Sequence, residues 1–267
     1  MGVALVTGAS AGLGREFAVQ LAGRGHDLVV VARDRARLES LAEELEARYA
    51  VRVEVLGADL LDRGDLARVA ERVADRERPV DLLVNNAGFG QRRGFVRNDL
   101  VEEEAAVNLM VRAPMVLSHA AAGGMRERRR GAILNVSSVA SFAPMGHYSA
   151  VKAYLTVLSE TLATELAPHG VTVTAVCPGI TRTEFHERAE MDMSALPHGL
   201  WLDAPRVVAD ALEAVARGKV VVVPSLPYTA LVALLRVVPR RVTRRVAGAL
   251  AERRRSGSRT RRAPRGH

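Results

Sequence analysis

The chain has 267 residues, a hydrophobic fraction of 48% and an aromatic fraction of 4%, so its apolar content is mostly Ala, Val and Leu. This length allows one large core, and this composition is typical of helices packed on a buried parallel sheet. The formal charge of +8 comes from residues 240–267, where eleven arginines face the single acid Glu252, so residues 1–239 carry a net charge of −2. That distribution argues against a nucleic-acid-binding fold and predicts a disordered, solvated basic end.

The sequence shows no sign of export or of a membrane span. The first residues, Met1-Gly-Val-Ala-Leu-Val, lack the basic region of a signal peptide, and no apolar run reaches the roughly 20 residues that cross a bilayer. The lone Cys177 excludes an intramolecular disulfide and fits a reducing compartment, and we expect it to be free and buried. We therefore expect a cytoplasmic protein.

Apolar runs alternate with amphipathic stretches along some 220 residues. Strands separated by helices form right-handed βαβ units, so the pattern predicts an α/β fold with one doubly wound parallel sheet in a single domain. The predicted strands are Val3–Thr7, Leu28–Ala32, Val51–Leu56, Leu82–Val84, Ala132–Val136, Val171–Val176 and Val220–Val223. The predicted helices are Leu13–Gly23, Arg35–Arg48, Leu66–Arg76, Glu102–Met125 and Ser149–Pro168.

The first strand leads into the glycine-rich turn Thr7-Gly-Ala-Ser-Ala-Gly-Leu-Gly14, and a helix opens at Leu13. Such a turn lets the backbone approach a pyrophosphate, whose charge the helix N-terminus stabilises. The alternative is a tight turn without a ligand, but the strand-turn-helix setting favours a nucleotide site. The candidate cofactor-binding residues of this turn are Gly8, Ser10, Gly12, Leu13 and Gly14.

The second strand ends in Val29-Val-Val-Ala-Arg33, without the acid that often binds the ribose 2′-hydroxyl of a dinucleotide. A carboxylate would repel a 2′-phosphate, whereas the guanidinium of Arg33 would bind it by charge-assisted hydrogen bonds. We therefore predict NADP(H) rather than NAD(H) as the cofactor. The alternative is that Arg33 is an exposed residue at the start of the following helix.

Two further segments follow strands at the edge where open α/β sheets bind ligands. Asp59-Leu60 follows the third strand and is a candidate for binding the adenine amino group. The run Asn85-Asn-Ala-Gly88 follows the fourth strand and offers Asn85, Ala87 and Gly88 as cofactor contacts. Because Asn and Gly favour turns, this run could also be a turn alone.

Tyr148 and Lys152 lie four residues apart, and residues at this spacing share one face of a helix. A nearby ammonium group favours the phenolate, so we expect Lys152 to lower the pKa of Tyr148 toward neutrality. A phenol tuned in this way can exchange a proton with a substrate. The spacing also arises by chance on exposed helices, so its significance depends on the rest of the chain.

In combination these motifs resemble the short-chain dehydrogenase/reductase superfamily, particularly its bacterial ketone- and acyl-reducing branch. The resemblance covers residues 1 to about 225 and implies a Rossmann-like catalytic domain. The residues that carry it are Thr7-Gly-Ala-Ser-Ala-Gly-Leu-Gly14, Asp59-Leu60, Asn85-Asn-Ala-Gly88, Asn108, Ser137-Ser138, Tyr148-Ser-Ala-Val-Lys152 and Pro178-Gly179.

The resemblance implies catalytic roles for four residues. Tyr148 would be the general acid for carbonyl reduction, and Lys152 would lower its pKa and bind the nicotinamide ribose. Ser138 would stabilise the developing oxyanion. Asn108 would hold a water in a proton relay, although a helical Asn can also be a core polar residue.

One point departs from the family pattern and leaves the catalytic serine open. Ser138 lies only ten residues before Tyr148, closer than is common in the family, so Ser137 and Ser141 remain alternatives for the catalytic serine. Only one of Ser137 and Ser138 can face the site, because side chains alternate along a strand.

The loop after the sixth strand completes the expected cofactor site. Pro178 and Gly179 match the family motif, and Thr181 and Thr183 are candidates for binding the nicotinamide carboxamide and the phosphates. The segment from Glu184 to Asp203 is rich in apolar residues and would form a lid over an apolar substrate, or would simply pack.

We divide the chain into a catalytic domain (1–225), a C-terminal helical extension (226–252) and a basic disordered tail (253–267). The extension is apolar and then basic, so it could lie on an anionic membrane. We favour packing over the pocket or between subunits, because the extension is short and Pro239 interrupts it. The resemblance implies a homodimer or homotetramer that uses the helices carrying Asn108 and Tyr148.

The leading interpretation is an NADP(H)-dependent oxidoreductase that interconverts an apolar ketone or oxoacyl compound and a secondary alcohol. The alternatives are reduction of a carrier-bound 3-oxoacyl group and a catalytically idle nucleotide sensor. We expect no metal in the site and no specific nucleic-acid partner.

Overall fold

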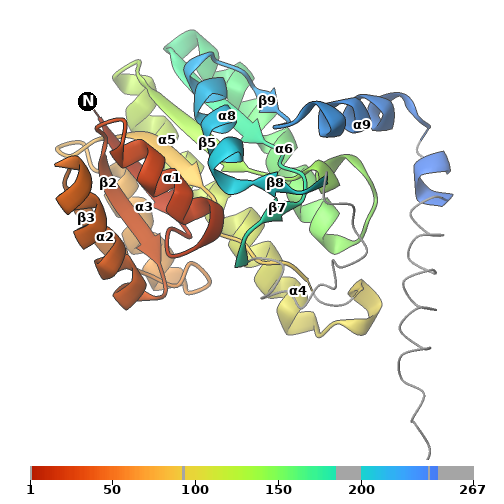
Figure 1. The fold of residues 1–267 in the computed structure, drawn as a ribbon, viewed down its shortest axis with the longest axis horizontal. Coiled ribbons are helices and arrows are strands. Elements are labelled where there is room, and N and C mark those ends of the chain that lie inside the picture. Colours follow the sequence, from red (N-terminus) through yellow and green to blue (C-terminus); the bar gives the residue numbers. More distant parts are fainter. Residues whose placement is uncertain (1, 92–93, 185–199, 240, 246–267) are drawn as a thin grey trace, which may run out of the picture.

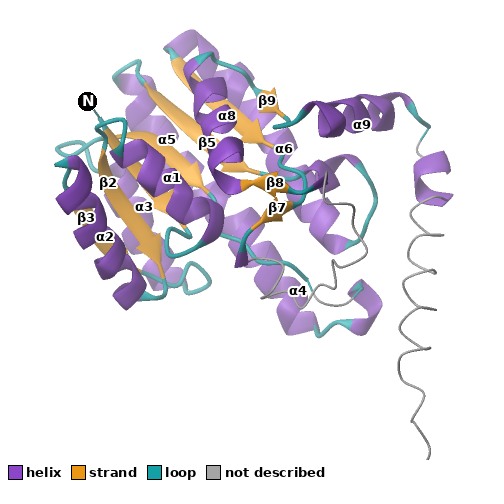
Figure 2. Ribbon diagram, viewed as in Figure 1, coloured by secondary structure: helices purple, strands orange, loops and turns teal. Residues whose placement is uncertain are grey.

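The computed structural model of the protein describes residues 2–91, 94–184, 200–239 and 241–245. Seven parallel strands form one sheet in the order β3-β2-β1-β4-β5-β6-β9, with helices on both faces (Figures 1 and 2). The strands are β1 (Val3–Thr7), β2 (Asp27–Ala32), β3 (Val53–Gly57), β4 (Val80–Asn85), β5 (Gly131–Val136), β6 (Val171–Val176) and β9 (Val221–Val222). The predicted doubly wound sheet and its seven strands are confirmed.

Eight α-helices are described, and six of them cover the two faces of the sheet. One core lies under α1, α2 and α8, and the other lies under α3, α5 and α6. Within β1 the side chains alternate, so that Ala4 and Val6 enter the first core and Leu5 enters the second. The helices are α1 (Gly12–Ala22), α2 (Arg35–Tyr49), α3 (Arg63–Ala74), α4 (Leu100–Val107), α5 (Ala113–Glu127), α6 (His147–Leu166), α8 (Ala204–Ala216) and α9 (Leu226–Val237).

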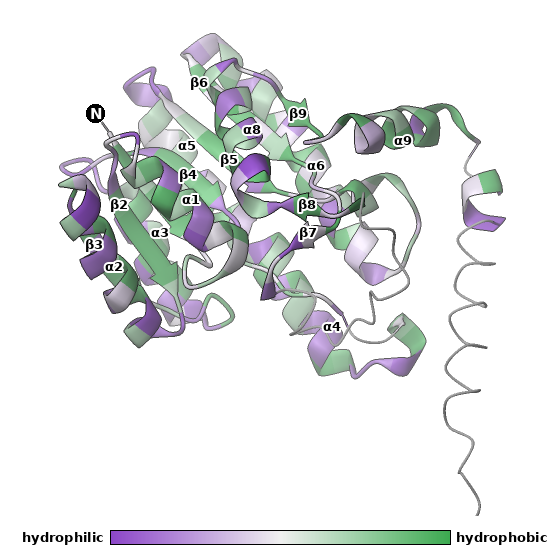
Figure 3. Cartoon of the chain, viewed as in Figure 1, coloured by the Kyte–Doolittle hydropathy of each residue, from purple (hydrophilic) through white to green (hydrophobic). Residues whose placement is uncertain are grey.

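The strands are hydrophobic along most of their length because helices cover both of their faces (Figure 3). The helices are amphipathic, and aspartate caps mark the starts of three of them. Asp34 accepts from the Arg37 N–H at the start of α2, and Asp62 accepts from the Asp65 N–H at the start of α3. Asp99 caps α4 in the same way.

Three elements differ from the sequence prediction. The helix expected over Glu102–Met125 is two helices, α4 and α5, joined by the π-helical turn η2 (Asn108–Arg112). Helix α8 was not predicted, nor was the short parallel pair β7 (Thr181–Arg182) and β8 (Leu202–Asp203). Hydrophobic periodicity is judged over windows of about 11–18 residues, so it does not resolve a five-residue π turn or a two-residue strand.

The order of strands reverses direction beside β1, which pairs with β2 on one side and with β4 on the other. In an open α/β sheet a ligand crevice forms at this point, outside the carboxyl ends of the strands. The glycine-rich turn after β1 and the Asn-rich turn after β4 both lie there. No helix among the described residues has the length and hydropathy needed to cross a membrane.

Candidate active site

The turn after β1 is an open backbone cradle at the start of α1. Gly8 and Gly12 have φ angles of +68° and +55°, in the left-handed region that favours glycine. A Cβ added to Gly14 would lie 2.1 Å from the Gly8 carbonyl oxygen, so a side chain there would displace the turn. The residue before α1, Ala11, provides no side-chain cap, and the first turn of α1 has no acid. This arrangement fits a pyrophosphate, which would accept the uncapped N–H groups.

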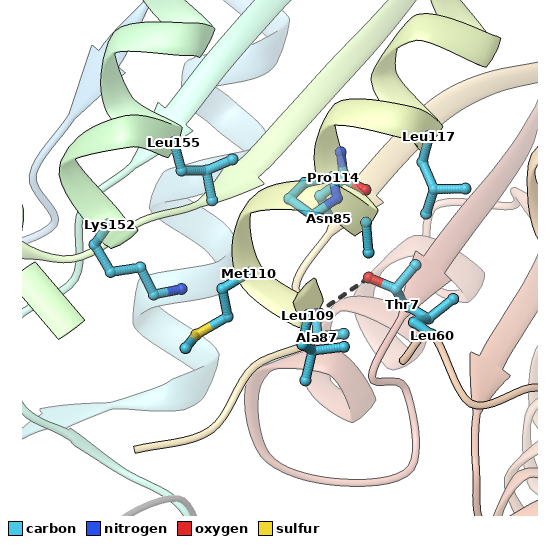
Figure 4. Close-up of a pocket in the computed structure, with 11 residues that line it drawn as sticks. Thr7, Leu60, Asn85, Ala87, Leu109, Met110, Pro114, Leu117, Lys152 and Leu155 are labelled. Atoms are coloured by element: carbon cyan, nitrogen blue, oxygen red, sulfur yellow. Dashed lines mark hydrogen bonds between the residues drawn. The ribbon is translucent and has the colours of Figure 1, made fainter. Parts of the chain in front are cut away.

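Thr7 and Asn86 join this cradle to the turn after β4. The Thr7 hydroxyl accepts from the Asn86 and Ala87 N–H groups at 3.0 and 3.1 Å, and the latter bond is drawn in Figure 4. The Asn86 side chain donates to the Thr7 carbonyl at 2.9 Å. Neither residue was among the sequence-based candidates, although both lie inside the motifs, because their role is to hold two turns together.

The Asn85 side chain points into the core rather than toward the cradle. Its Nδ2 donates to Ser118 Oγ at 3.1 Å and to Asn135 Oδ1 at 2.9 Å, and its own Oδ1 is buried without a partner. Asn135 in turn donates to Ser159 on α6 at 2.9 Å. The Asn85 amide thus joins β4, β5 and α5, and the expectation that Asn85 contacts a cofactor stays a prediction. Side-chain alternation at the end of β4 directs this side chain into the core.

Arg33 lies exposed directly after β2, and no hydrogen bond or ion pair to the described residues engages it. Its neighbours are engaged: Arg35 pairs with Glu39 at 2.7 Å, and Arg37 pairs with Asp34 at 3.4 Å. The Asp34 carboxylate also caps α2, so it is directed along the helix. The end of β2 thus offers one unengaged guanidinium, which fits a 2′-phosphate.

The remaining cofactor candidates lie around the same edge. The Asp59 carboxylate accepts from the Leu61 N–H at 3.0 Å, and Leu60 is buried. Thr183 lies beside the cradle, because a Cβ added to Gly12 would be 3.3 Å from Thr183 Cβ. The Thr181 hydroxyl donates to the Gly179 carbonyl at 3.1 Å. Of the predicted lid, only Glu184 and residues 200–203 lie within the described part of the chain.

The two adjacent serines after β5 point in different directions. Ser137 is buried, and its hydroxyl donates to the Lys152 carbonyl at 2.8 Å and shares a hydrogen bond of 2.7 Å with Thr156. The Ser138 hydroxyl instead forms a hydrogen bond with the Tyr148 side chain. It also accepts from the Ala140 N–H at 3.1 Å, which starts the turn η3 (Val139–Phe142). This geometry favours Ser138 over Ser137 as the partner of Tyr148.

Tyr148 and Lys152 share one face of α6, with the Lys152 Nζ 5.7 Å from the centroid of the Tyr148 ring. The ammonium donates to the Val136 carbonyl at 2.8 Å. Burial raises the pKa of the Tyr148 phenol above its ordinary value, and the Ser138 hydrogen bond offsets part of that rise. Burial also lowers the pKa of Lys152 to about 8.

The pKa of Tyr148 is shifted upward, opposite to the direction expected from Lys152 alone, and burial is the largest cause of this shift. The pair meets as predicted, but Lys152 is buried and Tyr148 is partly buried, and desolvation disfavours the charged form of each. The phenol accordingly holds its proton firmly, as suits a proton donor.

Asn108 begins the π turn that packs against α6. Its carbonyl accepts from the Ala113 N–H, five residues along the chain, so this turn contains one residue more than the usual hydrogen-bonded turn of an α-helix. Such π turns are frequent at functional sites because they redirect backbone groups. Met110 of this turn packs with Val151 and Tyr148, which places the turn behind the tyrosine.

A small cavity lies between the end of β4, the π turn and α6 (Figure 4). Its wall includes Lys152, Met110, Asn85 and Thr7. The cavity therefore lies between the face of α6 that carries Lys152 and the two turns after β1 and β4. Among the described residues, no cluster of His, Cys, Asp or Glu has the arrangement of a metal site.

A buried acid near Tyr148 was not found from the sequence. Glu103 on α4 is 3% exposed and accepts hydrogen bonds from Asn98, Gln91 and His147, the residue before Tyr148. Despite the opposing effect of burial, these hydrogen bonds lower the pKa of Glu103 below its ordinary value. The cluster ties the loop after β4 to the start of α6. Its members are far apart in sequence, so only the fold brings them together.

The sequence profile of the family described as "short chain dehydrogenase" matches residues 2–194. Among curated proteins, the 3-oxoacyl-(acyl-carrier-protein) reductase of Aquifex aeolicus is 32% identical over 68% of this chain and 75% of its own length. The very-long-chain 3-oxoacyl-CoA reductase of Aspergillus terreus is 36% identical over 65% of this chain. The chain spans only 51% of that fungal protein.

Solved structures are similar over more of the chain. A short-chain dehydrogenase from Sphingobium yanoikuyae in complex with NADPH is 38% identical, with a TM-score of 0.81 over 90% of this chain and 97% of that one. The bulky-bulky ketone specific alcohol dehydrogenase from Comamonas testosteroni is 33% identical, with a TM-score of 0.77 over 100% of this chain and 96% of that one.

Proposed function

The chain belongs to the short-chain dehydrogenase family and is an oxidoreductase, and on that premise we propose that it interconverts a ketone and a secondary alcohol with NADP(H) as cofactor. The observation that carries the proposal is the hydrogen bond between Ser138 and the Tyr148 phenol, with Lys152 on the same face of α6. This trio lies at the same edge of the sheet as the glycine cradle.

When bound, NADP(H) would supply or accept the hydride, and the protein supplies the proton and the electrostatics. Tyr148 donates its proton to the carbonyl oxygen of the ketone. Its raised pKa keeps the phenol protonated until the oxygen becomes basic enough to take that proton. Ser138 donates a hydrogen bond to the same oxygen and stabilises its developing charge. Asn108 holds a water that returns a proton toward Lys152.

Two observations support NADP(H) over NAD(H). Arg33 is an exposed cation at the end of β2 that no described residue engages, and the neighbouring Asp34 carboxylate caps α2 and pairs with Arg37. The Sphingobium relative, 38% identical, was solved with NADPH.

We expect Arg33→Glu to raise the KM for NADPH by about tenfold to a hundredfold, because a charge-assisted hydrogen bond becomes a repulsion. Arg35→Glu, on the same exposed helix start, is the matched control.

A second candidate is reduction of a 3-oxoacyl group carried as a thioester. The Aquifex aeolicus and Synechocystis relatives, both named 3-oxoacyl-(acyl-carrier-protein) reductases, favour it. The Comamonas relative, named for bulky ketones, favours the leading proposal. The two candidates share the chemistry and differ only in the substrate.

The test is NADPH oxidation measured with a panel of bulky ketones and 3-oxoacyl thioesters. We expect turnover with the wild-type protein and a loss of about 10²- to 10⁴-fold in kcat with Tyr148→Phe, because the proton donor is removed. Tyr154→Phe, on the same helix, should leave turnover unchanged. Tight NADPH binding without turnover of any substrate would instead identify a nucleotide sensor.

A further inference from the structure

Helix α9 presents an apolar face to solvent. Leu226 is 85% exposed, Val237 is 77% exposed, and Leu234 and Leu231 are 57% and 43% exposed. Leu226, Ala230, Leu234 and Val237 follow the three- and four-residue spacing of one helix face, and Arg236 is the only charged residue of α9. The helix is hydrophobic along most of its length (Figure 3).

The opposite face already fastens α9 to the catalytic domain. Tyr228 and Val232 are buried, and the Tyr228 hydroxyl donates to the Leu200 carbonyl at 2.8 Å and accepts from the Ile180 N–H at 3.3 Å. The Arg236 guanidinium lies 5.1 Å from the centroid of the Phe142 ring. The exposed face therefore contributes little to the fold, and a helix that is apolar on both faces normally has a second apolar environment.

The positive charge of the residues that follow α9 indicates which apolar environment its exposed face meets. Arg241, Arg244 and Arg245 are exposed, and residues 240–267 hold eleven arginines against one acid. A second copy docked through the same face would bring two such cationic segments together, which costs electrostatic energy. An anionic lipid surface complements both the apolar face and the arginines.

We infer that α9 docks on the surface of an anionic membrane, with its exposed apolar face in the acyl boundary and with Arg241, Arg244 and Arg245 at the head groups. The helix lies in the plane of the surface and does not cross it. Because α9 packs beside the turn Val139–Phe142, which follows Ser138, docking holds the candidate site next to the bilayer. Only this last consequence rests on the proposed function.

Sedimentation of the full chain with sucrose-loaded vesicles tests the inference. We expect binding to vesicles of equal parts phosphatidylcholine and phosphatidylglycerol, weakened by added salt, and little binding to phosphatidylcholine alone. Leu231→Glu/Leu234→Glu should lower the partition coefficient by about tenfold or more, because two exposed leucines lose their apolar burial. Ser40→Glu/Ala47→Glu, at exposed positions of α2, adds the same charge elsewhere and should bind as the wild type does.

Three outcomes would overturn the inference. The first is no sedimentation with anionic vesicles. The second is binding that deletion of residues 246–267 abolishes but the leucine substitutions leave unchanged, which would assign it to the tail alone. The third is a change in oligomeric state caused by Leu231→Glu/Leu234→Glu, which light scattering would detect and which would identify a protein interface. Thermal unfolding and NADPH oxidation by the same variants report whether they remain folded and active.

Discussion

At the scale of single residues, burial outweighs proximity in the Tyr148–Lys152 pair. Unit charges about 6 Å apart interact by about 3 kcal/mol near a protein surface. Burial shifts a pKa by up to about 3–5 units, each worth about 1.4 kcal/mol. The spacing in the sequence predicted the contact but not the desolvation, which depends on Met110, Val151 and the turn behind them. The pKa values therefore move in the direction set by burial.

The lowered pKa of Lys152, about 8 against the ordinary 10.5, predicts a pH dependence. As pH rises through about 8, the ammonium loses its proton and the positive charge beside Tyr148 disappears. We expect kcat/KM for ketone reduction to fall across this range and the transition to vanish in Lys152→Met. Lys219→Met should retain it. A profile that stays flat above pH 8 in the wild-type protein would contradict the prediction.

The same shift predicts how stability changes with pH. Between about pH 8 and pH 10.5 the unfolded chain binds a proton at Lys152 that the folded chain has released. The contribution of this residue to the free energy of unfolding therefore rises with pH across that window and is unfavourable below it. Chemical denaturation of the wild type and of Lys152→Met as a function of pH measures the difference.

Substitution of each of the two serines after β5 should have a different effect on catalytic rate and on stability. Ser138→Ala removes the donor beside Tyr148, and we expect kcat/KM to fall by about 10²- to 10³-fold with little change in thermal stability. Ser137→Ala removes buried hydrogen bonds to Lys152 and Thr156, and we expect a loss of about 1 kcal/mol in stability with a smaller effect on rate. The reverse pattern would assign the catalytic role to Ser137.

At the scale of elements, the site depends on how strands end and helices begin. The glycine turn, the Asn86 turn and η3 all follow parallel strands, so the sheet brings their polar groups to one edge. The sequence predicted these strands within a few residues. It did not reveal the π turn at Asn108, because the segments on both sides of this turn are helical and read as one continuous helix.

Gly14 should be intolerant of any side chain. In Gly14→Ala the new Cβ would lie 2.1 Å from the Gly8 carbonyl and 2.5 Å from Asn86 Nδ2, so the cradle must shift. We expect a loss of about 1–3 kcal/mol in stability and weaker NADPH binding, measured by thermal unfolding and fluorescence titration. Gly123→Ala on α5 meets nothing within 4 Å and should be neutral or stabilising.

At the scale of the whole molecule, charge and hydrophobic surface are unevenly distributed. The excess of basic residues falls in residues 240–267, which follow α9 along the chain, while residues 1–239 are nearly neutral. The sequence-based preference for packing of the extension holds for one face of α9, through Tyr228 and Val232. Its other face is exposed, and only the structure could separate the two.

Self-association remains a prediction. Met115 on α5 and Val157 on α6 are exposed apolar residues on the helices expected to form the interface. We expect light scattering to report a dimer or tetramer, because paired helices would bury these side chains. Met115→Asp/Val157→Asp should shift the species toward the monomer, while a wild-type monomer would contradict the prediction.

The sequence by itself determined the parallel sheet, the glycine turn, the Tyr148–Lys152 spacing and the family, because these depend on local periodicity and short motifs. The tertiary structure decided which serine meets Tyr148, the inward direction of Asn85, the buried Glu103 cluster and the direction of both pKa shifts. Those features depend on contacts between residues distant in the chain and on exclusion of water. Neither exists until the sheet and its helices have assembled.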